Sequence, residues 1–396
     1  MASTNSDRPA RIMVAGGGIG GMTAALALNR AGFSVTLLEQ APVLGDVGAG
    51  LTVQPSATRA IDYLGLGAAF RRFADPSPSS WVFHHRTGEA IAELMSAGHA
   101  ADADGVTWYH RVHRADFLAM LESAIRSASP DTLRLGCRVA RVEQGGGRVV
   151  AVLADGTRVE GDALVGADGA RSPIRAQLFD TGTPQFRGQV AYRCLIPMER
   201  VRDALGGRTS GTYIGPGRIF NQYPVRRGTI LNCVGIVRTG DWQEEGWSTP
   251  ATHEEFRAQF AGWHESLTGV IAEAPGDQLI KWALYDRDPL PRWSDGRITL
   301  LGDAAHPILP FLGLAGAMAI EDAVVLARAC AASPDDLEAA FLNYERVRQP
   351  RTRHVLINSR EQGEVYQDSD TDAYATRPRP NADPELYTYN PATAAL

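Results

Sequence analysis

Residues 11–39 read RIMVAGGGIGGMTAALALNRAGFSVTLLE. The apolar run at 11–15 suits a buried parallel strand, and the glycine-rich turn at 16–21 follows it at once. Ala and Leu at helical spacing then predict a helix up to Ala31, and a second apolar strand ends in Glu39. This order of strand, glycine turn, helix, strand and acid predicts a dinucleotide-binding unit.

Three glycines of the turn have distinct expected roles. Gly16 permits the tight turn, Gly18 lets the backbone approach a pyrophosphate, and Gly21 lets the helix pack closely on the strand. The amides and positive end of the helix would hold the phosphates. Glu39 can accept hydrogen bonds from ribose hydroxyls and would repel a 2′-phosphate, which favours an unphosphorylated ADP moiety. The motif by itself fits FAD and NAD equally.

Two later segments favour FAD. The strand at 162–167 runs into Asp168-Gly169, and the strand at 297–301 runs into Gly302-Asp303. A carboxylate beside a glycine at a strand end can bind the ribityl hydroxyls of a flavin. The helix predicted at 315–329 can direct its first amides at the flavin pyrimidine carbonyls. An NAD-dependent dehydrogenase would leave both later motifs without a role.

With these three motifs the sequence resembles the para-hydroxybenzoate hydroxylase class of flavoprotein monooxygenases. It is most similar to the branch of salicylate hydroxylases, 3-hydroxybenzoate 6-hydroxylases and 6-hydroxynicotinate 3-monooxygenases. The resemblance runs from about Ile12 to about Arg360. Four further segments carry it: 48–51 with Gln54-Pro55, His113 to Phe117, Asp288 to Trp293, and 386–389.

The resemblance implies that Glu39 binds the adenosine ribose, that Arg114 and Asp303 bind the FAD diphosphate and ribityl region, and that Asp168-Gly169 serves both FAD and nicotinamide-cofactor use. Pro310 and the backbone at 312–315 would lie beside the isoalloxazine. One departure stands out: Leu314 replaces the family's Gln, and the next glycine is shifted to Gly316. The full set of candidate cofactor-binding residues is Gly16, Gly18, Gly21, Glu39, Gln40, Gly50, Arg114, Asp168, Gly169, Gly302, Asp303, Gly313, Leu314 and Ala315.

The expected fold class is α/β, with a discontinuous Rossmann-like FAD domain, a mixed and mostly antiparallel substrate-binding sheet, and C-terminal helices. The expected ranges are 11–74, 113–177 and 288–358 for the FAD domain, 80–109 and 186–285 for the substrate domain, and 368–396 for an extended tail.

The implied reaction has two halves. NADH or NADPH reduces FAD, and reduced flavin with O₂ forms a C4a-hydroperoxide whose distal oxygen is electrophilic. The substrate is then an electron-rich ring, a phenolic or hydroxypyridine acid, in the catabolism of aromatic compounds. The alternative is a flavin-dependent oxidase or epoxidase of the same fold that acts on a non-acidic or secondary-metabolite substrate. A flavin-binding protein without redox turnover is the more distant rival.

Candidate catalytic residues are His306, Tyr223 and Pro310, and candidate substrate contacts are Gln222, Tyr192, Arg193, Arg218 and Phe311. Phenol activation needs a base or a hydrogen-bond acceptor, and arginine forks suit a carboxylate. Structural readings stay open as well: a histidine that caps the loop, arginines in surface ion pairs, and tyrosines packed in a sheet. Thr52 and Phe311 stand where 6-hydroxynicotinate 3-monooxygenases have histidines, so the pocket is less polar.

Composition sets the wider limits. The chain has 396 residues, is 44% hydrophobic, and carries a net charge of −6, so no basic surplus indicates a nucleic-acid partner. Four scattered cysteines at 137, 194, 233 and 330 show neither a metal-ligand spacing nor a disulfide pattern, which favours a reduced cytoplasmic protein. A polar N-terminus and glycine-broken apolar runs argue against a signal peptide or a membrane span, and a homodimer is the general expectation.

Overall fold

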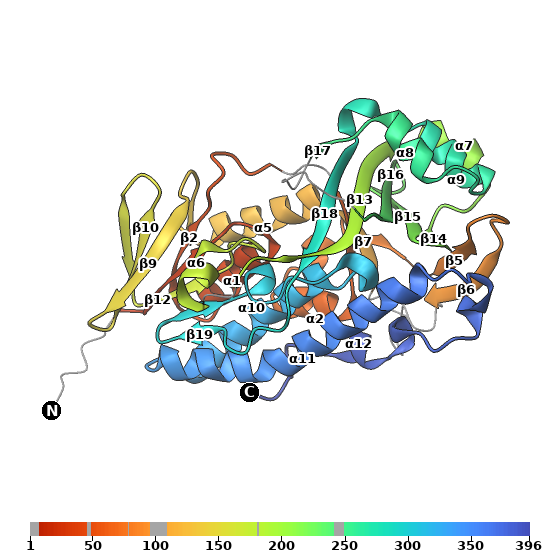
Figure 1. Cartoon of the computed structure of the whole chain (residues 1–396). Helices are drawn as coiled ribbons and strands as arrows, with labels where there is room; N and C mark the ends of the chain where they lie inside the picture. The colour runs from red at the N-terminus through yellow and green to blue at the C-terminus, as the bar shows by residue number, and fades with distance from the viewer. Residues whose placement is uncertain (1–7, 46–48, 78, 96–108, 180–181, 241–248) are drawn as a thin grey trace.

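The computed structural model describes residues 8–45, 49–77, 79–95, 109–179, 182–240 and 249–396. It has two main layers, a six-stranded sheet with helices around it and an eight-stranded sheet (Figure 1). This mixed α/β architecture confirms the predicted fold class. Gly48 and residues 96–108, which two of the expectations include, lie outside the described ranges.

The six-stranded sheet is parallel except at one edge. Its central strand buries Ile12, Met13 and Val14 completely, as expected for a strand covered on both faces. Its order is β19 (Ser294–Asp295), β20 (Ile298–Leu300), β12 (Ala163–Gly166), β1 (Arg11–Ala15), β2 (Ser34–Leu38) and β8 (Leu133–Arg134).

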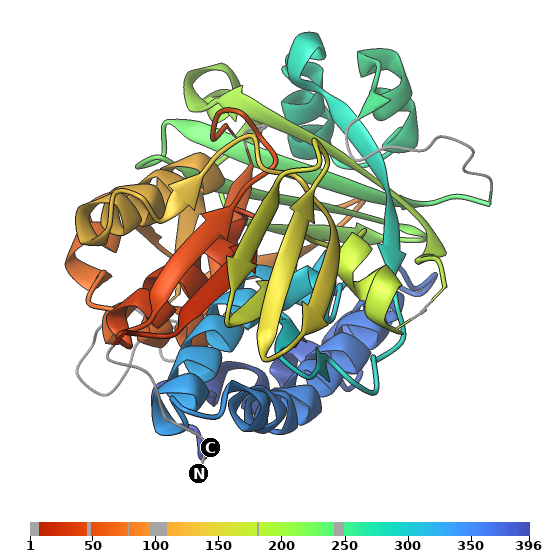
Figure 2. The ribbon, with the colours of Figure 1, turned by 90° about the vertical axis from the view of Figure 1, so that its left-hand side faces the viewer.

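Helices pack on this sheet and on one another. The glycine turn leads into α1 (Ile19–Arg30), which contacts both α5 (Arg114–Ala128) and α10 (Ala315–Ala332). The long helix α11 (Leu337–Tyr366) packs on α10. The small sheet of β11 (Arg158–Gly161), β10 (Arg148–Leu153) and β9 (Val139–Gly145) lies beside the parallel strands (Figure 2), and α6 (Pro173–Phe179) packs on β9.

The eight-stranded sheet is antiparallel except where β14 runs parallel to β5. One of its faces packs on three helices, α7 (Met198–Leu205), α8 (His253–Gln259) and α9 (Glu265–Ala272), while the other looks toward the cofactor layer (Figure 1). Its order is β17 (Thr249–Pro250), β18 (Ile280–Asp286), β13 (Gln185–Pro197), β16 (Ile230–Arg238), β15 (Arg218–Val225), β14 (Gly211–Gly215), β5 (Ser80–His84) and β6 (Ala90–Met95).

A fourth sheet, of three strands, lies between the two layers. It consists of β3 (Gly50–Val53), β7 (His110–His113) and β4 (Asp75–Pro76), with β7 in the middle. The chain leaves β3 into α2 (Pro55–Tyr63) and α3 (Gly67–Phe70), and it leaves β7 directly into α5. Strand β7 also contacts β15 of the large sheet, so this small sheet joins the two layers.

The expectation of an extended tail after residue 368 is wrong. The segment forms three short helical turns, at Asp372–Ala375, Pro380–Ala382 and α12 (Glu385–Thr388), and folds back along α11 (Figure 1). Leu386 is fully buried, and the Arg351 guanidinium donates to the carbonyl oxygens of Glu385 (2.9 Å) and Leu386 (2.7 Å). Burial of apolar side chains and these hydrogen bonds to main-chain carbonyls outweigh the polar composition.

In the part of the chain that the structure describes, no helix combines the length and apolar character needed for a membrane crossing.

Candidate cofactor and substrate site

The glycine turn has the geometry of a phosphate-binding loop. Gly16 has φ +109°, and a Cβ there would lie 2.3 Å from the Ala167 carbonyl oxygen. A Cβ on Gly21 would lie 1.8 Å from the Gly16 oxygen, so both positions need glycine for chain packing. At Gly18, by contrast, a Cβ would have no neighbour within 4 Å. This open space beside the first amides of α1 is what a diphosphate requires.

A cavity of about 260 Å³ adjoins this turn, and Gly18, Glu39 and Arg114 line it. Glu39 accepts hydrogen bonds from the amides of Gly17 and Ala41, the latter at 2.7 Å, so its carboxylate is fixed at the end of β2. Remaining lone pairs of that carboxylate can accept from ribose hydroxyls. Gln40 is exposed and does not line this cavity, so its expected contact has no support from the geometry.

The second acid lies on the turn after β20. Gly302 has φ +62°, and Asp303 follows in a single helical turn. Asp303 is exposed to solvent, although protein lies close enough around its carboxylate to affect its pKa. Burial raises the pKa of this carboxyl, while His306, Arg114 and Arg175 act in the opposite direction. Asp303 is therefore placed to accept hydrogen bonds from a polyol chain such as ribityl.

A fully buried network holds this turn from behind. Asp322 on α10 accepts from the Gly302 amide at 3.0 Å and lies 2.6 Å from His306 Nε2. Arg348 on α11 donates to Asp322 at 2.7 Å and pairs with Glu321 at 2.8 Å. Burial alone would raise the pKa of Asp322, but His306 and Arg348 outweigh it and hold the pKa below its ordinary value. Asp322 thus stays ionised and fixes the turn.

The network removes His306 from the candidate bases. Its ring packs 5.2 Å from Trp293, pairs with Asp322, and does not line the large cavity described below. The geometry therefore gives no support to the expectation that His306 contacts substrate or flavin, and it favours the alternative that His306 fixes the loop.

The Asp168-Gly169 loop ties the other two motifs together. A Cβ on Gly16 would lie 3.1 Å from the Asp168 Cα, so the loop packs directly on the glycine turn. Asp168 Oδ2 accepts from the Ile174 amide at 3.4 Å, near the start of α6. Arg175 on α6 is 1% exposed and donates to the Ala304 carbonyl at 2.8 Å. Gly169 has φ +83°, which favours glycine there.

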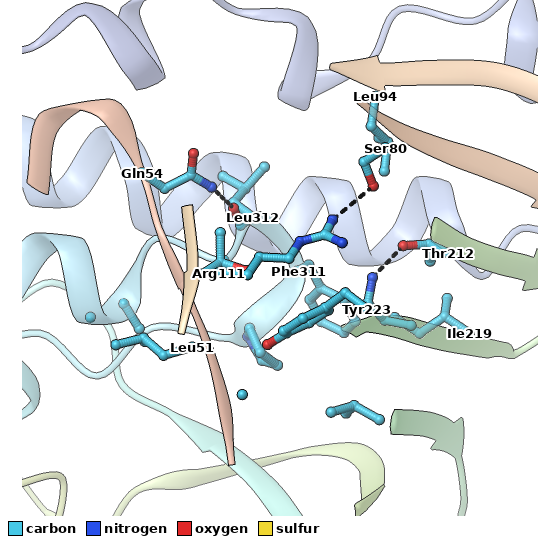
Figure 3. Close-up of a pocket in the computed structure, with 18 of the residues that line it drawn as sticks. Leu51, Gln54, Ser80, Leu94, Arg111, Thr212, Ile219, Tyr223, Phe311 and Leu312 are labelled. Atoms are coloured by element: carbon cyan, nitrogen blue, oxygen red, sulfur yellow. Dashed lines mark hydrogen bonds between the residues drawn. The ribbon is translucent and has the colours of Figure 1, made fainter. Parts of the chain in front are cut away.

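A larger cavity of about 310 Å³ lies between β3, residues 310–316 and the inner face of the eight-stranded sheet (Figure 3). On the cofactor side it reaches the start of α10, whose first amides have no intrahelical partner. These amides suit the flavin pyrimidine carbonyls, and with the open space at Gly18 and the exposed Asp303 the described residues fit an FAD molecule. Seven expected residues line this cavity: Gly50, Arg193, Tyr223, Pro310, Phe311, Gly313 and Ala315.

Leu314 departs from the expected cofactor contact. Its side chain is fully buried in the core of the cofactor layer, so only its backbone can face the flavin. The shifted Gly316 has a packing reason, because a Cβ there would lie 3.0 Å from Leu51 of β3. Gly313, at φ +64°, keeps the left-handed turn.

Three of the residues expected to contact substrate do not face the cavity. Tyr192 donates to Glu255 at 2.7 Å and packs on the helix layer, and Gln222 donates to the Arg208 carbonyl at 2.6 Å. Successive residues of a strand point to opposite faces, so Arg193 and Tyr223 reach the cavity and their neighbours Tyr192 and Gln222 cannot. Arg218 also lies outside the cavity lining.

The prominent cavity residue that the sequence did not reveal is Arg111 on β7, which is only 3% exposed. Its guanidinium lies 4.6 Å from the centre of the Tyr223 ring. The C-terminal segment also supplies cavity residues, among them Asn381 and Tyr387. No contiguous motif marks these positions; only the tail's similarity to other members at 386–389 hinted at them.

The charged side chains that line the cavity are cationic. The described residues that line it include Arg111 and Arg193 but no carboxylate and no histidine. Burial raises the pKa of Tyr223 to about 12, although the nearby Arg111 acts against this. Tyr223 therefore keeps its proton at neutral pH and is a hydrogen-bonding group rather than a base.

Comparison with known proteins agrees with this site. The chain is 36% identical to 3-hydroxybenzoate 6-hydroxylase 1 of Aquipseudomonas alcaligenes over 88% of this chain and 87% of that protein. It is 35% identical to a 3-amino-4-hydroxybenzoate 2-monooxygenase of Streptomyces platensis, over 92% and 90% respectively. The crystal structure of Klebsiella pneumoniae HpxO complexed with FAD and uric acid superposes with a TM-score of 0.80 at 27% identity, covering 94% of this chain and 93% of that one.

The family model described as "FAD binding domain" matches residues 10–359, nearly the whole of both layers. The chain therefore belongs to this FAD-binding family, within its branch of flavoprotein aromatic monooxygenases.

Proposed function

We propose that this protein uses NADH or NADPH, FAD and O₂ to hydroxylate a small electron-rich aromatic acid, a phenol or hydroxypyridine that carries a carboxylate. The observation that carries the proposal is the cavity beside the start of α10. Its volume of about 310 Å³ suits one small ring, and its charged lining groups among the described residues are two arginines. An anionic ring is the ligand that this environment favours.

When bound, FAD would accept electrons from the nicotinamide cofactor and allow one oxygen atom of O₂ to be transferred to the ring. The first role of the protein chain is to bind the cofactor. The amides at the start of α1 hold the diphosphate, Glu39 holds the adenosine ribose, and Asp303 holds the ribityl chain. Gly313 and Ala315 would present their main chain to the isoalloxazine, and the buried Asp322 network holds the Gly302–Asp303 turn.

On the substrate side, the chain orients the ring and stabilises its charge. The Tyr223 hydroxyl lies near Thr52 and keeps its proton, so it can exchange hydrogen bonds with a ring hydroxyl. Arg111 and Arg193 favour the ionised, more electron-rich form of a phenol because both are cationic and face the cavity. Apolar side chains of Leu51, Ile236 and Phe311 keep water away from the reacting atoms.

We also propose which parts of the chain bind FAD and which bind the substrate. Residues 11–74, 113–177 and 288–358 would bind FAD, and residues 80–109 and 186–285 would form most of the substrate wall. The strands found in each sheet support this assignment, with the addition that the C-terminal segment contributes to the substrate wall.

The test is turnover by purified, FAD-loaded protein. NADH and NADPH oxidation, O₂ uptake and product mass would be followed with salicylate, 3- and 4-hydroxybenzoate, hydroxynicotinates and hydroxypicolinates, each beside its carboxamide as a matched neutral control. We expect one acid to stimulate oxidation and to yield a product heavier by one oxygen. Stimulation by carboxamides but not by acids would contradict the acidic substrate and favour the non-acidic alternative. If no compound of the panel stimulates oxidation, the assignment to small aromatic rings is contradicted.

A further inference from the structure

Arg111 is a buried cation that pairs with none of the described acidic groups. It lies in the middle strand of the β3–β7–β4 sheet, paired with Thr52 on one side and Asp75 on the other. Its side chain is 3% exposed, and no ion pair joins it to a carboxylate within the described residues. Asp75, the nearest candidate across the strand pair, accepts instead from the Arg227 amide at 2.9 Å.

The neighbours of Arg111 are neutral and hydroxyl-bearing. One Nη donates to Ser210 Oγ, and the other donates to Ser80 Oγ at 3.2 Å (Figure 3). The guanidinium is stacked 4.6 Å from the centre of the Tyr223 ring, and its buried Nε has no hydrogen-bond partner. Each serine accepts from Arg111 and so keeps its own hydroxyl proton to donate elsewhere.

This arrangement is a receptor for an anion. A buried charge without a counter-charge is unfavourable, and the penalty falls when a ligand supplies the opposite charge. A planar guanidinium matches a carboxylate, and the free Nε lets the fork take two oxygens at once. Arg193, the other cation of the lining, is only half-buried and lies 5.2 Å from the centre of the Trp282 ring. Arg111 is 3% exposed, so it loses more hydration and gains more from a bound anion.

We propose that Arg111 binds the substrate carboxylate, with Ser80 and Ser210 as supporting hydroxyls, and that it thereby sets the preference of the cavity for aromatic acids. This inference rests on the proposed function and names the side chain behind its substrate class. The stack on Tyr223 then fixes the direction of the guanidinium, so the ring of the substrate is held relative to the flavin through its carboxylate.

The test is a binding measurement that does not depend on turnover. Benzoate and benzamide differ in charge but hardly in size, and their dissociation constants for the FAD-loaded protein can be read from the change in flavin absorbance. We expect the wild type to bind benzoate more tightly than benzamide. We expect Arg111→Gln to weaken benzoate binding by on the order of 10- to 100-fold and to leave benzamide binding nearly unchanged. Arg111→Lys should fall between the two, because it keeps the charge but loses the fork.

Arg202→Gln is the matched control, since this arginine is exposed on α7, away from the cavity, and should keep the wild-type preference. A wild type that does not prefer benzoate, or an Arg111→Gln variant that keeps the preference, would overturn the proposal. Loss of FAD from Arg111→Gln, measured by flavin content, would also overturn it by assigning Arg111 to the cofactor. A preference that depends on Arg111 together with no turnover on any acid would contradict the proposed function alone.

Discussion

The two ends of the site are built from different parts of the chain. At the cofactor end the contacts that we propose come mainly from main-chain amides and from glycines, at the turn after β1, the turn after β20 and the start of α10. At the substrate end they come from side chains that project from strands, with Arg111 and Tyr223 in contact with each other. Main-chain contacts depend on how the loop is held, whereas side-chain contacts depend on which residue stands at one position. Substitutions at the two ends should therefore fail in different ways.

The largest effect is expected from removing the support behind the cofactor loop. Arg348→Met leaves Asp322 and Glu321 buried with less positive charge, and breaking such a buried ion pair costs about 3–5 kcal/mol of the free energy of unfolding. FAD affinity should fall as well, because Asp322 holds the Gly302 amide. Denaturant unfolding and flavin content measure both.

The control for that experiment is Arg200→Met, which breaks an exposed pair with Glu273. We expect a much smaller loss of stability there, because solvent screens exposed pairs. Equal losses in the two variants would show that the buried network does not support the loop.

The next effect separates cofactor binding from folding. At Gly18 a new side chain meets nothing in the protein, so Gly18→Val should leave the fold intact. The valine would occupy the space where the diphosphate is expected, and we predict about 100-fold weaker FAD binding, equivalent to roughly 2.7 kcal/mol. Gly276→Val is the matched control, since it too has open space and lines neither cavity. Retained FAD affinity in Gly18→Val would place the diphosphate elsewhere.

At the substrate end a smaller effect is expected. Tyr223→Phe removes one neutral hydroxyl, and we predict a roughly 2- to 12-fold loss in kcat/KM, the range of one net hydrogen bond. Because burial raises the pKa of Tyr223 to about 12, its loss should not change the pH profile between pH 6 and 9. A titration in that range that disappears in the variant would mean that Tyr223 acts as a base after all.

The same division explains what the sequence could predict. The three cofactor motifs are short and contiguous, and each couples a strand end to a turn. Gly16 and Glu39 could therefore be predicted from spacing, and Asp303 from its place at a strand end together with the family resemblance. Arg111 could not, because its partners Ser80 and Ser210 are 31 and 99 residues away.

Strand alternation was a partial guide. It indicates that either Gln222 or Tyr223 faces the cavity, but not which one. That choice depends on the helices that cover the other face, where Phe256 of α8 packs on Phe220, two residues before Gln222. The tail was mispredicted for a similar reason: its polar composition does not reveal that Arg351 of α11 bonds to carbonyls 34 and 35 residues further on.

The smallest effect is expected far from both ends, at His85, where the substrate sheet meets the C-terminal segment. Its ring is 7% exposed, lies 4.6 Å from the His84 ring, and approaches Thr371. Burial lowers its pKa to about 4; His84 and Arg86 add to this shift, and Asp372 opposes it. In the unfolded chain a histidine titrates near 6.5. Between these values the unfolded state binds the proton more strongly, so the contribution of neutral His85 is present above about pH 6.5 and is lost as the pH falls toward 4.

His85→Gln removes this titration. The difference in unfolding free energy between pH 7 and pH 5 should therefore shrink by on the order of 1 kcal/mol relative to the wild type, because at pH 5 His85 is protonated in the unfolded chain but neutral in the folded one. Urea unfolding at the two pH values measures it, with FAD content as the check that neither end of the site has changed. An undiminished pH dependence would mean that His85 stays accessible to protonation in the folded protein. The C-terminal segment would then pack less tightly around His85 than the burial of Tyr374 and Leu386 indicates.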